Sequence, residues 1–213
     1  MKRGWFITVE GGEGAGKTTV METIQAVLRE ARLPMEMTRE PGGTPLGEEL
    51  RGILLDPRWQ GMHQDTELLL MFAARAEHVH RRIRPALAAG RWVVSDRFTD
   101  ATYAYQGGGR GVDMRRIEAL EDWTLHGFGP DRTLLLDLPV ETGLARARQR
   151  GEPDRFEQEQ QAFFERVRAA YLERARREPQ RFVRIDAALD LPQVRAAVWR
   201  IVRQWVRESG AVS

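Results

Sequence analysis

The sequence predicts an α/β fold in which a five-stranded parallel sheet carries helices on both faces. Short apolar runs alternate with longer segments of helical periodicity from one end of the chain to the other. The length of 213 residues suits one compact domain, and no internal repeat, low-complexity tract or linker divides it. We therefore expect a single domain covering residues 1–213.

The expected elements follow from these two patterns. Short, mostly apolar runs are typical of strands buried on both faces, and they occur at 5–9, 35–38, 92–95, 133–136 and 182–185. Helical periodicity marks 17–31, 64–89, 113–126, 140–149, 157–178 and 190–207. In the last helix, Val194, Val198, Ile201, Val202 and Trp205 recur at helical spacing, which favours core packing over a partner interface. Stretches rich in Gly or Pro predict functional loops at 41–47, 107–111 and 151–153.

Composition excludes several classes of protein. Hydrophobic residues make up 42% and charged residues 30% of the chain, which is typical of a globular protein and not of a disordered one. No apolar run approaches the roughly 18 residues of a membrane span, and the absence of cysteine excludes disulfides and thiolate metal sites. The net charge is only +2, with Arg and Glu interleaved, so we expect neither a nucleic-acid nor a membrane partner. The N-terminal residues lack the pattern of a signal peptide, and we expect a cytoplasmic enzyme.

A glycine-rich motif follows the first strand and opens the first helix. The residues 11–18, GGEGAGKT, match the pattern G-x-x-x-x-G-K-[ST] of a phosphate-binding P-loop. Its backbone N–H groups surround an anion, Lys17 reaches the β- and γ-phosphates, and the Thr18 hydroxyl binds Mg²⁺. The residues expected to bind ATP are Gly11, Gly12, Glu13, Gly14, Ala15, Gly16, Lys17, Thr18 and Thr19.

The kind of P-loop protein is narrowed by what the chain lacks. A GTPase reads guanine with an Asn-Lys-x-Asp element, and this chain contains no asparagine. An ATP-using kinase or a motor-like ATPase remains, and the small size favours a kinase.

Two aspartates follow apolar strands and are candidates for the catalytic centre. Asp96 ends the run 92–95, and Asp137 ends the run 133–136, so both fall at carboxyl ends of strands, where α/β proteins bind ligands. Asp96 is followed by Arg97, which would hold a second phosphate near the same metal ion. Asp137 is followed by Leu138 and Pro139, which is more typical of capping or packing. We therefore favour Asp96 as catalytic residue and, with Thr18, as metal ligand.

Several motifs together make the chain resemble the bacterial thymidylate kinases over nearly its whole length. They are VEGGEGAGKTT (9–19), TREPGG (38–43), LMFAAR (70–75), DRF (96–98), AYQGGGRG (104–111) and the lid-like RQRGEPDR (148–155). The resemblance departs at Phe98, where many members carry an aromatic hydroxyl. It implies a P-loop kinase fold with a small mobile lid at about 146–158. It also implies transfer of the γ-phosphoryl group of MgATP to dTMP for dTTP synthesis, by a homodimer.

The resemblance also implies roles for individual residues. The acceptor is already a phosphate dianion at pH 7, so cations are needed more than a general base. Arg39 and Arg97 would clamp this phosphate, Glu13 would contact the sugar or the metal shell, and Phe72 would stack on thymine while Arg75 donates to a base carbonyl. The residues expected to bind dTMP are Glu13, Arg39, Phe72, Arg75, Arg97, Thr102, Tyr105 and Gln106. A missing methyl group is worth only about 1–3 kcal/mol, so we expect incomplete discrimination against dUMP.

A further cation is expected from the lid. Lys17 is the only cation in the P-loop, so a second positive charge for the transferring phosphoryl group must come from elsewhere. The resemblance implies that the lid supplies it, and we expect Arg148, Arg150 or Arg155 to do so. With Lys17, Asp96 and Arg97 they form the expected catalytic set. The alternative for this segment is a solvated helix end. Two alternatives for the whole protein remain: a deoxynucleoside kinase with Asp96 or Glu10 as base, and a regulatory ATP-binding module.

Overall fold

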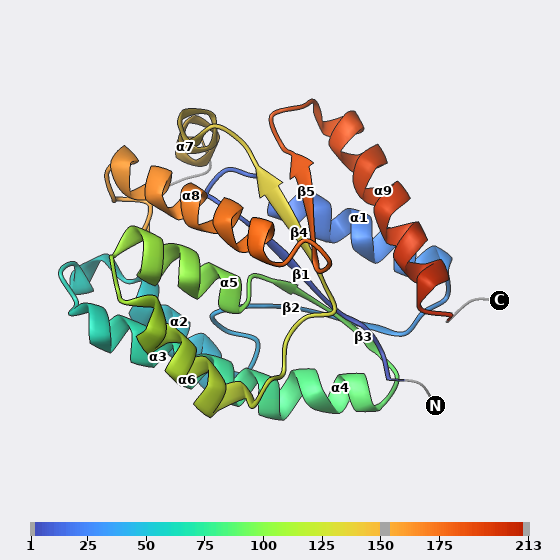
Figure 1. The fold of residues 1–213 in the computed structure, drawn as a ribbon, viewed down its shortest axis with the longest axis horizontal. Helices are drawn as coiled ribbons and strands as arrows, with labels where there is room; N and C mark the ends of the chain where they lie inside the picture. Colours follow the sequence, from blue (N-terminus) through green and yellow to red (C-terminus); the bar gives the residue numbers. More distant parts are fainter. Residues whose placement is uncertain (1–2, 150–153, 211–213) are drawn as a thin grey trace.

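The computed structural model describes residues 3–149 and 154–210, and its five strands form one parallel sheet (Figure 1). The strands are β1 (Phe6–Gly11), β2 (Met35–Arg39), β3 (Trp92–Asp96), β4 (Arg132–Asp137) and β5 (Phe182–Asp186). Their order across the sheet is β2-β3-β1-β4-β5. All neighbouring pairs are parallel. The predicted fold class is confirmed, and each strand overlaps the apolar run that predicted it.

Helices connect the strands on both sides of the sheet (Figure 1). They are α1 (Lys17–Glu30), α2 (Pro45–Leu55), α3 (Gln64–His78), α4 (Arg84–Ala88), α5 (Thr99–Thr102), α6 (Met114–Leu125), α7 (Val140–Arg148), α8 (Gln161–Arg177) and α9 (Leu191–Glu208). Three short segments, η1 (Pro57–Trp59), η2 (Val79–Ile83) and η3 (Tyr103–Gly109), have 3₁₀ or π geometry. The predicted helix 64–89 is confirmed as α3, η2 and α4 in succession, and the helix predicted from 157 begins at Gln161.

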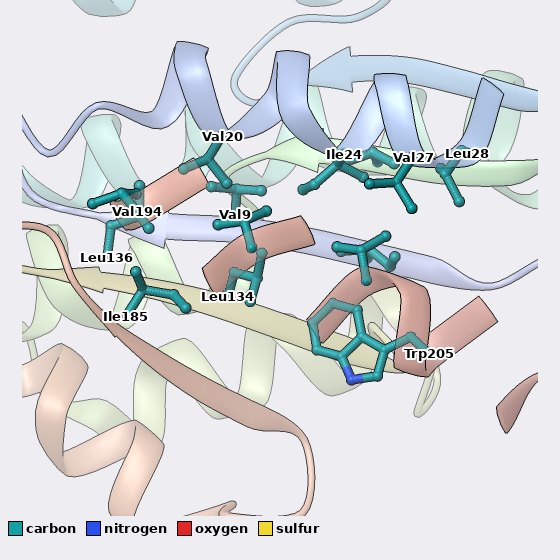
Figure 2. Packing of buried hydrophobic residues seen from close by; sticks show 14 of the residues in the cluster. Val9, Val20, Ile24, Val27, Leu28, Leu134, Leu136, Ile185, Val194 and Trp205 are labelled. Carbon is teal, nitrogen blue, oxygen red and sulfur yellow. The ribbon is translucent and has the colours of Figure 1, made fainter. Parts of the chain in front are cut away.

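One face of the sheet is covered by α1 and α9. Side chains alternate along a strand, so Ile7 and Val9 of β1 point to the same side and meet Val20 and Ile24 of α1. Figure 2 shows this cluster, in which Trp205 of α9 and Leu134 of β4 close the layer. Each fully buried aliphatic side chain contributes about 1.5–3 kcal/mol, which makes this layer a principal source of stability.

The opposite face of the sheet carries α4, α6 and α8. Phe6 and Val93 pack with residues of η2, α4 and α6, while Leu135 and Phe182 pack with α8. This face also holds polar groups, because Thr8 of β1 hydrogen-bonds to Thr133 of β4 at 2.8 Å. The side of the sheet that faces α8 is therefore partly polar.

The apolar stripe of α9 lies in the core, as predicted. Val194, Val198, Val202 and Trp205 are all at most 6% exposed, and Ile201 packs against them. None of the helices within residues 3–149 and 154–210 is long and apolar enough to cross a membrane.

The predicted loop at 41–47 is shorter than expected, because α2 begins inside it. Thr44 caps the helix by accepting a hydrogen bond from the Gly47 amide at 3.0 Å, and Pro45 occupies the first turn. Thr followed by Pro is a helix-start signal that the sequence carries and that the loop prediction overlooked.

The predicted loop at 107–111 is corrected as well, because η3 continues to Gly109. A methyl group on Gly108 would lie 2.7 Å from the Ala170 Cβ atom, and one on Gly109 would lie 2.4 Å from the Phe163 ring, both in α8. The glycines therefore let η3 pack closely on α8. The stretch predicted as a loop at 151–153 lies outside the described residues.

Candidate active site

The P-loop connects β1 to α1 and packs directly on α7. Gly14 has a φ of +68°, and a methyl group on its Cα would lie 1.9 Å from the Gly143 carbonyl oxygen of α7. Conversely, a methyl group on Gly143 would lie 2.4 Å from the Glu13 carbonyl oxygen. The loop and α7 therefore meet backbone against backbone, and neither position has room for a side chain.

Lys17 lies within the curve of this loop. Its Nζ atom donates to the carbonyl oxygens of Gly11 at 3.2 Å and Gly12 at 3.1 Å. Burial and the nearby charge of Arg97 lower the pKa of Lys17, against the opposing effect of Glu13 and Asp96. An anion bound at this position would replace these bonds to neutral carbonyl oxygens by a bond between two charged groups.

Asp96 and Arg97 lie beside the P-loop because β3 pairs with β1 and both strands end at the same edge. Asp96 is level with Val9 in β1 and with Arg39 in β2. Among the described residues, the buried Oδ1 atom of Asp96 has no hydrogen-bond partner. Arg97 adopts a φ of +70°, which is rare for a residue with a side chain.

Glu13, Arg97 and Tyr105 form a compact hydrogen-bonded triangle. The Arg97 Nη2 atom donates to the Glu13 Oε1 atom at 2.6 Å and to the Tyr105 hydroxyl at 2.7 Å, and that hydroxyl donates to the same Glu13 oxygen at 2.7 Å. Burial by itself would raise the pKa of Glu13, but the charges of Arg97 and Lys17 and these hydrogen bonds lower it to about 2. Glu13 is therefore a fixed negative charge within the P-loop.

A cavity of about 510 Å³ opens next to this triangle. It is lined by Glu13, Glu40, Pro41, Arg51, Leu55, Met71, Arg75, Arg97, Phe98, Ala101, Thr102, Tyr105, Gln106, Asp154 and Phe156. The cavity brings together six of the eight residues expected to bind dTMP: Glu13, Arg75, Arg97, Thr102, Tyr105 and Gln106. The cavity therefore joins Glu13 of the P-loop to the residues of the predicted dTMP site.

Phe72 is not one of the residues that line this cavity, so the pocket lends no support to its predicted stacking on thymine. Its ring is buried with Leu68 and Tyr103 in a separate apolar cluster, and the Arg75 guanidinium lies over it at 4.9 Å. Met71, one position earlier on α3, lines the cavity instead. Adjacent helix positions point about 100° apart, so the rotation of α3 decides which of the two side chains faces a ligand.

Arg39 is half-exposed and pairs with Glu48 of α2. Its Nη2 atom lies 2.8 Å from the Glu48 Oε2 atom, while the Gly43 amide donates to the other oxygen at 2.8 Å. Arg51, which the sequence did not single out, lines the cavity and donates to the Pro41 carbonyl oxygen at 3.0 Å. Burial and repulsion from Arg39 and Arg97 lower the pKa of Arg51. Three arginines therefore share one corner of the site.

Two other acidic residues, Glu10 and Asp137, have hydrogen-bond partners that indicate structural roles. Glu10 is fully buried, and its two oxygens accept from the Phe98 amide at 2.7 Å and the Tyr171 hydroxyl at 2.9 Å. Burial and the neighbouring charge of Asp100 raise the pKa of Glu10 to about 8. Asp137 accepts from the Arg168 Nε atom at 2.7 Å, which accords with a packing role. Glu10 has no exposed surface with which to act as a base toward a substrate.

The lid arginines lie in different surroundings. Arg148 is exposed at the end of α7, beside a cleft that Glu157 and Glu159 also line. Arg150 lies outside the described residues. Arg155 is only 1% exposed: its Nε atom donates to the Leu54 carbonyl oxygen at 2.7 Å, and its Nη1 atom pairs with Glu67 at 2.6 Å. The expectation that Arg155 supplies a cation to the phosphates is corrected, because the buried carboxylate of Glu67 holds it in the interior.

Comparisons with known proteins agree on one family. A family model described as thymidylate kinase matches residues 9–198. A thymidylate kinase of Pseudomonas putida is 61% identical over 193 residues, covering 91% of this chain and 93% of the relative. A thymidylate kinase of Halorhodospira halophila is 59% identical and covers 87% of both chains. The crystal structure of thymidylate kinase from Ehrlichia chaffeensis superposes with a TM-score of 0.76 at 33% identity, covering 94% of this chain and 99% of that one.

Proposed function

Because the chain belongs to the thymidylate kinase family and phosphorylates dTMP to dTDP with ATP, we propose that transfer takes place where the P-loop meets the 510 Å³ cavity. The observation that carries this proposal is the triangle of Glu13, Arg97 and Tyr105. It joins a P-loop residue to two residues of the cavity through three hydrogen bonds of 2.6–2.7 Å. A phosphate donor on the P-loop and an acceptor in the cavity would then meet at Arg97.

On the donor side, the proposed ATP site is the P-loop and its Lys17. Backbone N–H groups from Gly11 to Thr19 would surround the β- and γ-phosphates, and α1 contributes the partial positive charge of its N-terminus. Lys17 would move from the carbonyl oxygens of Gly11 and Gly12 to the phosphates. Its charge then stabilises the phosphoryl group as negative charge builds up during transfer.

Magnesium is proposed as the ion that accompanies ATP. Among the described residues, no cluster of three or more His, Asp or Glu side chains could hold a metal ion by itself. Mg²⁺ usually binds through one or two protein oxygens together with substrate phosphates, and the unpartnered Oδ1 atom of Asp96 and the exposed hydroxyl of Thr18 fit that requirement. When bound, the ion would neutralise part of the negative charge of the phosphates.

On the acceptor side, the cationic corner is proposed to bind the phosphate of dTMP. Arg97 and Arg51 line the cavity. Arg39 would leave its ion pair with Glu48 and bind the same phosphate. Guanidinium groups bind phosphate through paired hydrogen bonds. The phosphate is already a dianion near neutral pH, so no general base is needed. The burial of Glu10 removes one of the two bases that a deoxynucleoside kinase would use.

The base and the sugar of dTMP are proposed to occupy the rest of the cavity. Arg75 would donate to a base carbonyl, and Thr102 and Gln106, which line the same cavity, would contact the base or the sugar. Tyr105 would lie against the sugar and exclude a ribose hydroxyl. Met71 replaces Phe72 as the apolar contact of the base, since only Met71 of the two lines the cavity. A flexible thioether contacts a flat ring without demanding one geometry.

The lid is proposed as residues 146–158 of one kinase domain. With Arg155 buried, Arg148 and Arg150 are left as candidates for the additional cation on the transferring phosphoryl group. Arg148 follows Gly143 on α7, the helix that touches the P-loop, so a small movement of α7 would carry it toward the phosphates.

A homodimer is proposed from the outer surface of α2 and α3. Leu46, Ile53 and Leu69 expose 54%, 40% and 57% of their areas, and Leu46 and Ala73 share a surface cleft with Ala76. Exposed apolar side chains that gather on adjoining helices are typical of an interface. Because ATP and dTMP are metabolites of the cytoplasm, we also propose that the enzyme works there.

The experiment that tests the function is an ADP-release assay with purified protein across dTMP, dUMP, thymidine, AMP, CMP and GMP. We expect turnover with dTMP, weaker turnover with dUMP, and none with thymidine. Equal efficiency with dUMP and dTMP would contradict the assignment of the base pocket, and turnover with thymidine would support a nucleoside kinase instead.

A further inference from the structure

Two buried polar atoms of residues that line the cavity lack a partner. Within the part of the chain that the structure describes, the Arg75 Nη1 atom donates no hydrogen bond and the Gln106 Oε1 atom accepts none. Arg75 is only 3% exposed and Gln106 is 0% exposed. Both residues line the cavity. An unpaired donor and an unpaired acceptor in one pocket indicate a ligand that offers an acceptor to Arg75 and a donor to Gln106.

The other atoms of these two side chains are already engaged. The Arg75 Nε atom donates to Glu40 at 2.8 Å, and its Nη2 atom donates to the Phe98 carbonyl oxygen at 3.1 Å. The Gln106 Nε2 atom donates to the Glu67 Oε1 atom at 2.8 Å. Each side chain therefore keeps one specific atom for a ligand.

Glu67 does not line the cavity, yet it decides which atom Gln106 keeps. It is 1% exposed, and it pairs with Arg155 at 2.6 Å and with Arg110 at 3.4 Å. A carboxylate between two guanidinium groups only accepts hydrogen bonds. The NH₂ group of the Gln106 amide must therefore face Glu67, and the carbonyl oxygen is left for the ligand. If the amide turned over, two oxygens would face each other in the interior.

The resulting pair of a donor from Arg75 and an acceptor from Gln106 matches one edge of a pyrimidine. Thymine presents a carbonyl oxygen at position 4 beside an N–H group at position 3. Cytosine presents the reverse, an amino group beside an unprotonated ring nitrogen. If a buried site is complementary to the thymine pattern, binding of cytosine sets donor against donor and acceptor against acceptor. This costs far more binding free energy than a missing methyl group.

We propose that Glu67 is a specificity-determining residue that acts by positioning: it fixes the Gln106 amide so that the cavity accepts an imide edge and rejects an amidine edge. This inference rests on the proposed function, in that the base of dTMP is placed at Arg75 and Gln106. It gives Arg155 a role as well, because this lid residue holds the Glu67 carboxylate in place. Base selection thus depends on a residue that touches no substrate.

The test compares dTMP with 5-methyl-dCMP, which differs from it only at positions 3 and 4 of the ring. The variant Glu67→Gln keeps the shape of the side chain but offers its own NH₂ group, so that the Gln106 amide can turn over. Glu67→Asp retains the charge beside Arg155 and withdraws the carboxylate from Gln106, which keeps the test valid if the neutral variant folds poorly. Glu36→Gln is the matched control, since Glu36 also pairs with two arginines, Arg82 and Arg91, but does not line the cavity.

For each protein, kcat and KM are measured with both nucleotides. We expect Glu67→Gln to lower the ratio of kcat/KM for dTMP over 5-methyl-dCMP by about tenfold or more, mostly through KM for dTMP. Glu67→Asp should lower it in the same direction, and Glu36→Gln should leave it unchanged. In a Gln106→Leu background, Glu67→Gln should have no further effect on the ratio, because there is no amide left to orient.

The outcomes separate this inference from the proposed function. Failure of the wild-type protein to phosphorylate dTMP would overturn the function itself. If the wild-type protein uses dTMP but both Glu67 variants lose activity equally with the two nucleotides, Glu67 is only structural and the inference is wrong. A change of ratio that persists in the Gln106→Leu background would also contradict it.

Discussion

Gly14 of the P-loop and Gly143 of α7 touch backbone to backbone: a methyl group on Gly14 would lie 1.9 Å from the Gly143 carbonyl oxygen. The contact joins the phosphate-binding loop to the helix that leads into the lid. Two glycines far apart in sequence are needed because any side chain at either position would separate the two segments.

Replacing Gly143 by alanine should therefore impair ATP binding without changing any residue that contacts ATP. The new methyl group would lie 2.4 Å from the Glu13 carbonyl oxygen and displace the loop. A displacement of about 1 Å can cost up to about 10²-fold in rate, so we expect kcat/KM for ATP to fall by about tenfold or more, with KM for dTMP little changed. Gly129→Ala is the control, because a methyl group there meets nothing within 4 Å. Equal kinetics of the two variants would refute the coupling.

Arg97 should not tolerate replacement by lysine. The Nη2 atom of Arg97 donates to both Glu13 and Tyr105, so the other N–H groups of the guanidinium are needed to bind the phosphate. A lysine has no planar fork, so Arg97→Lys should lower kcat/KM for dTMP by about 10²-fold, while KM for ATP changes less. The control is Arg115→Lys, since Arg115 is exposed and pairs only with Asp113 among its described partners. Kinetics of Arg97→Lys that match this control would exclude the phosphate clamp.

The buried Glu10 should make stability depend on pH in a defined direction. Burial and Asp100 raise its pKa from 4.5 to about 8. A raised carboxyl pKa in the folded state means that the contribution to stability is fully present below pH 4.5 and is lost as the pH rises toward 8. The Glu10→Gln variant stays neutral, so its free energy of unfolding relative to the wild type should increase between these pH values, by at most about 1.4 kcal/mol per pH unit. Urea denaturation at pH 5 and pH 8 measures this. A difference that stays constant or falls would contradict the raised pKa.

Replacement of Arg155 and of Arg148 by alanine should affect different properties, stability for Arg155 and catalysis for Arg148. Arg155 and Glu67 are a buried pair, with side chains 2% and 1% exposed, and loss of one partner of such a pair costs about 3–5 kcal/mol. Arg155→Ala should therefore lower the melting temperature markedly. Arg148 is exposed, so Arg148→Ala should keep the wild-type melting temperature and lose kcat. Calorimetry and steady-state kinetics on both variants decide this. An unchanged melting temperature of Arg155→Ala would contradict the buried role.

A charge placed on the outer surface of α3 should separate the proposed dimer. Leu69 is 57% exposed, and Leu69→Arg would put a solvated cation into an apolar interface. Light scattering after gel filtration should give the mass of one chain for this variant and twice that mass for the wild type. Leu189→Arg, at an exposed leucine that precedes α9, is the control. A wild-type protein with the mass of a single chain would refute the dimer.

The fold could be predicted from the sequence because buried parallel strands are short apolar runs and helices have their own period. The loops were less predictable. The glycines of η3 are explained by close packing on Ala170 and Phe163, which are distant in sequence. A run of glycines gives no local signal that separates such packing from a turn.

The candidate site was predictable where a motif determines the backbone conformation. It was less predictable where the orientation of a side chain depends on how its helix packs. Lys17, Asp96 and Arg97 follow strands whose register brings them together. Whether Met71 or Phe72 faces the cavity depends on the rotation of α3, which the sequence does not state. Arg51 was missed because none of the motifs contains it and the helix that carries it, α2, was not predicted. Arg155 is held by Glu67, and only the folded chain reveals that pairing.

The most direct test of the account compares dTMP with thymidine as acceptors for ATP in the wild-type protein, with the products identified by phosphorus NMR. Arg51 is buried beside the charges of Arg39 and Arg97, and only an acceptor that carries a phosphate brings an anion to offset this repulsion. We predict that dTMP yields dTDP and ADP in equal amounts and that thymidine yields no phosphorylated product. Formation of dTMP from thymidine, or no dTDP from dTMP, would contradict the central claim.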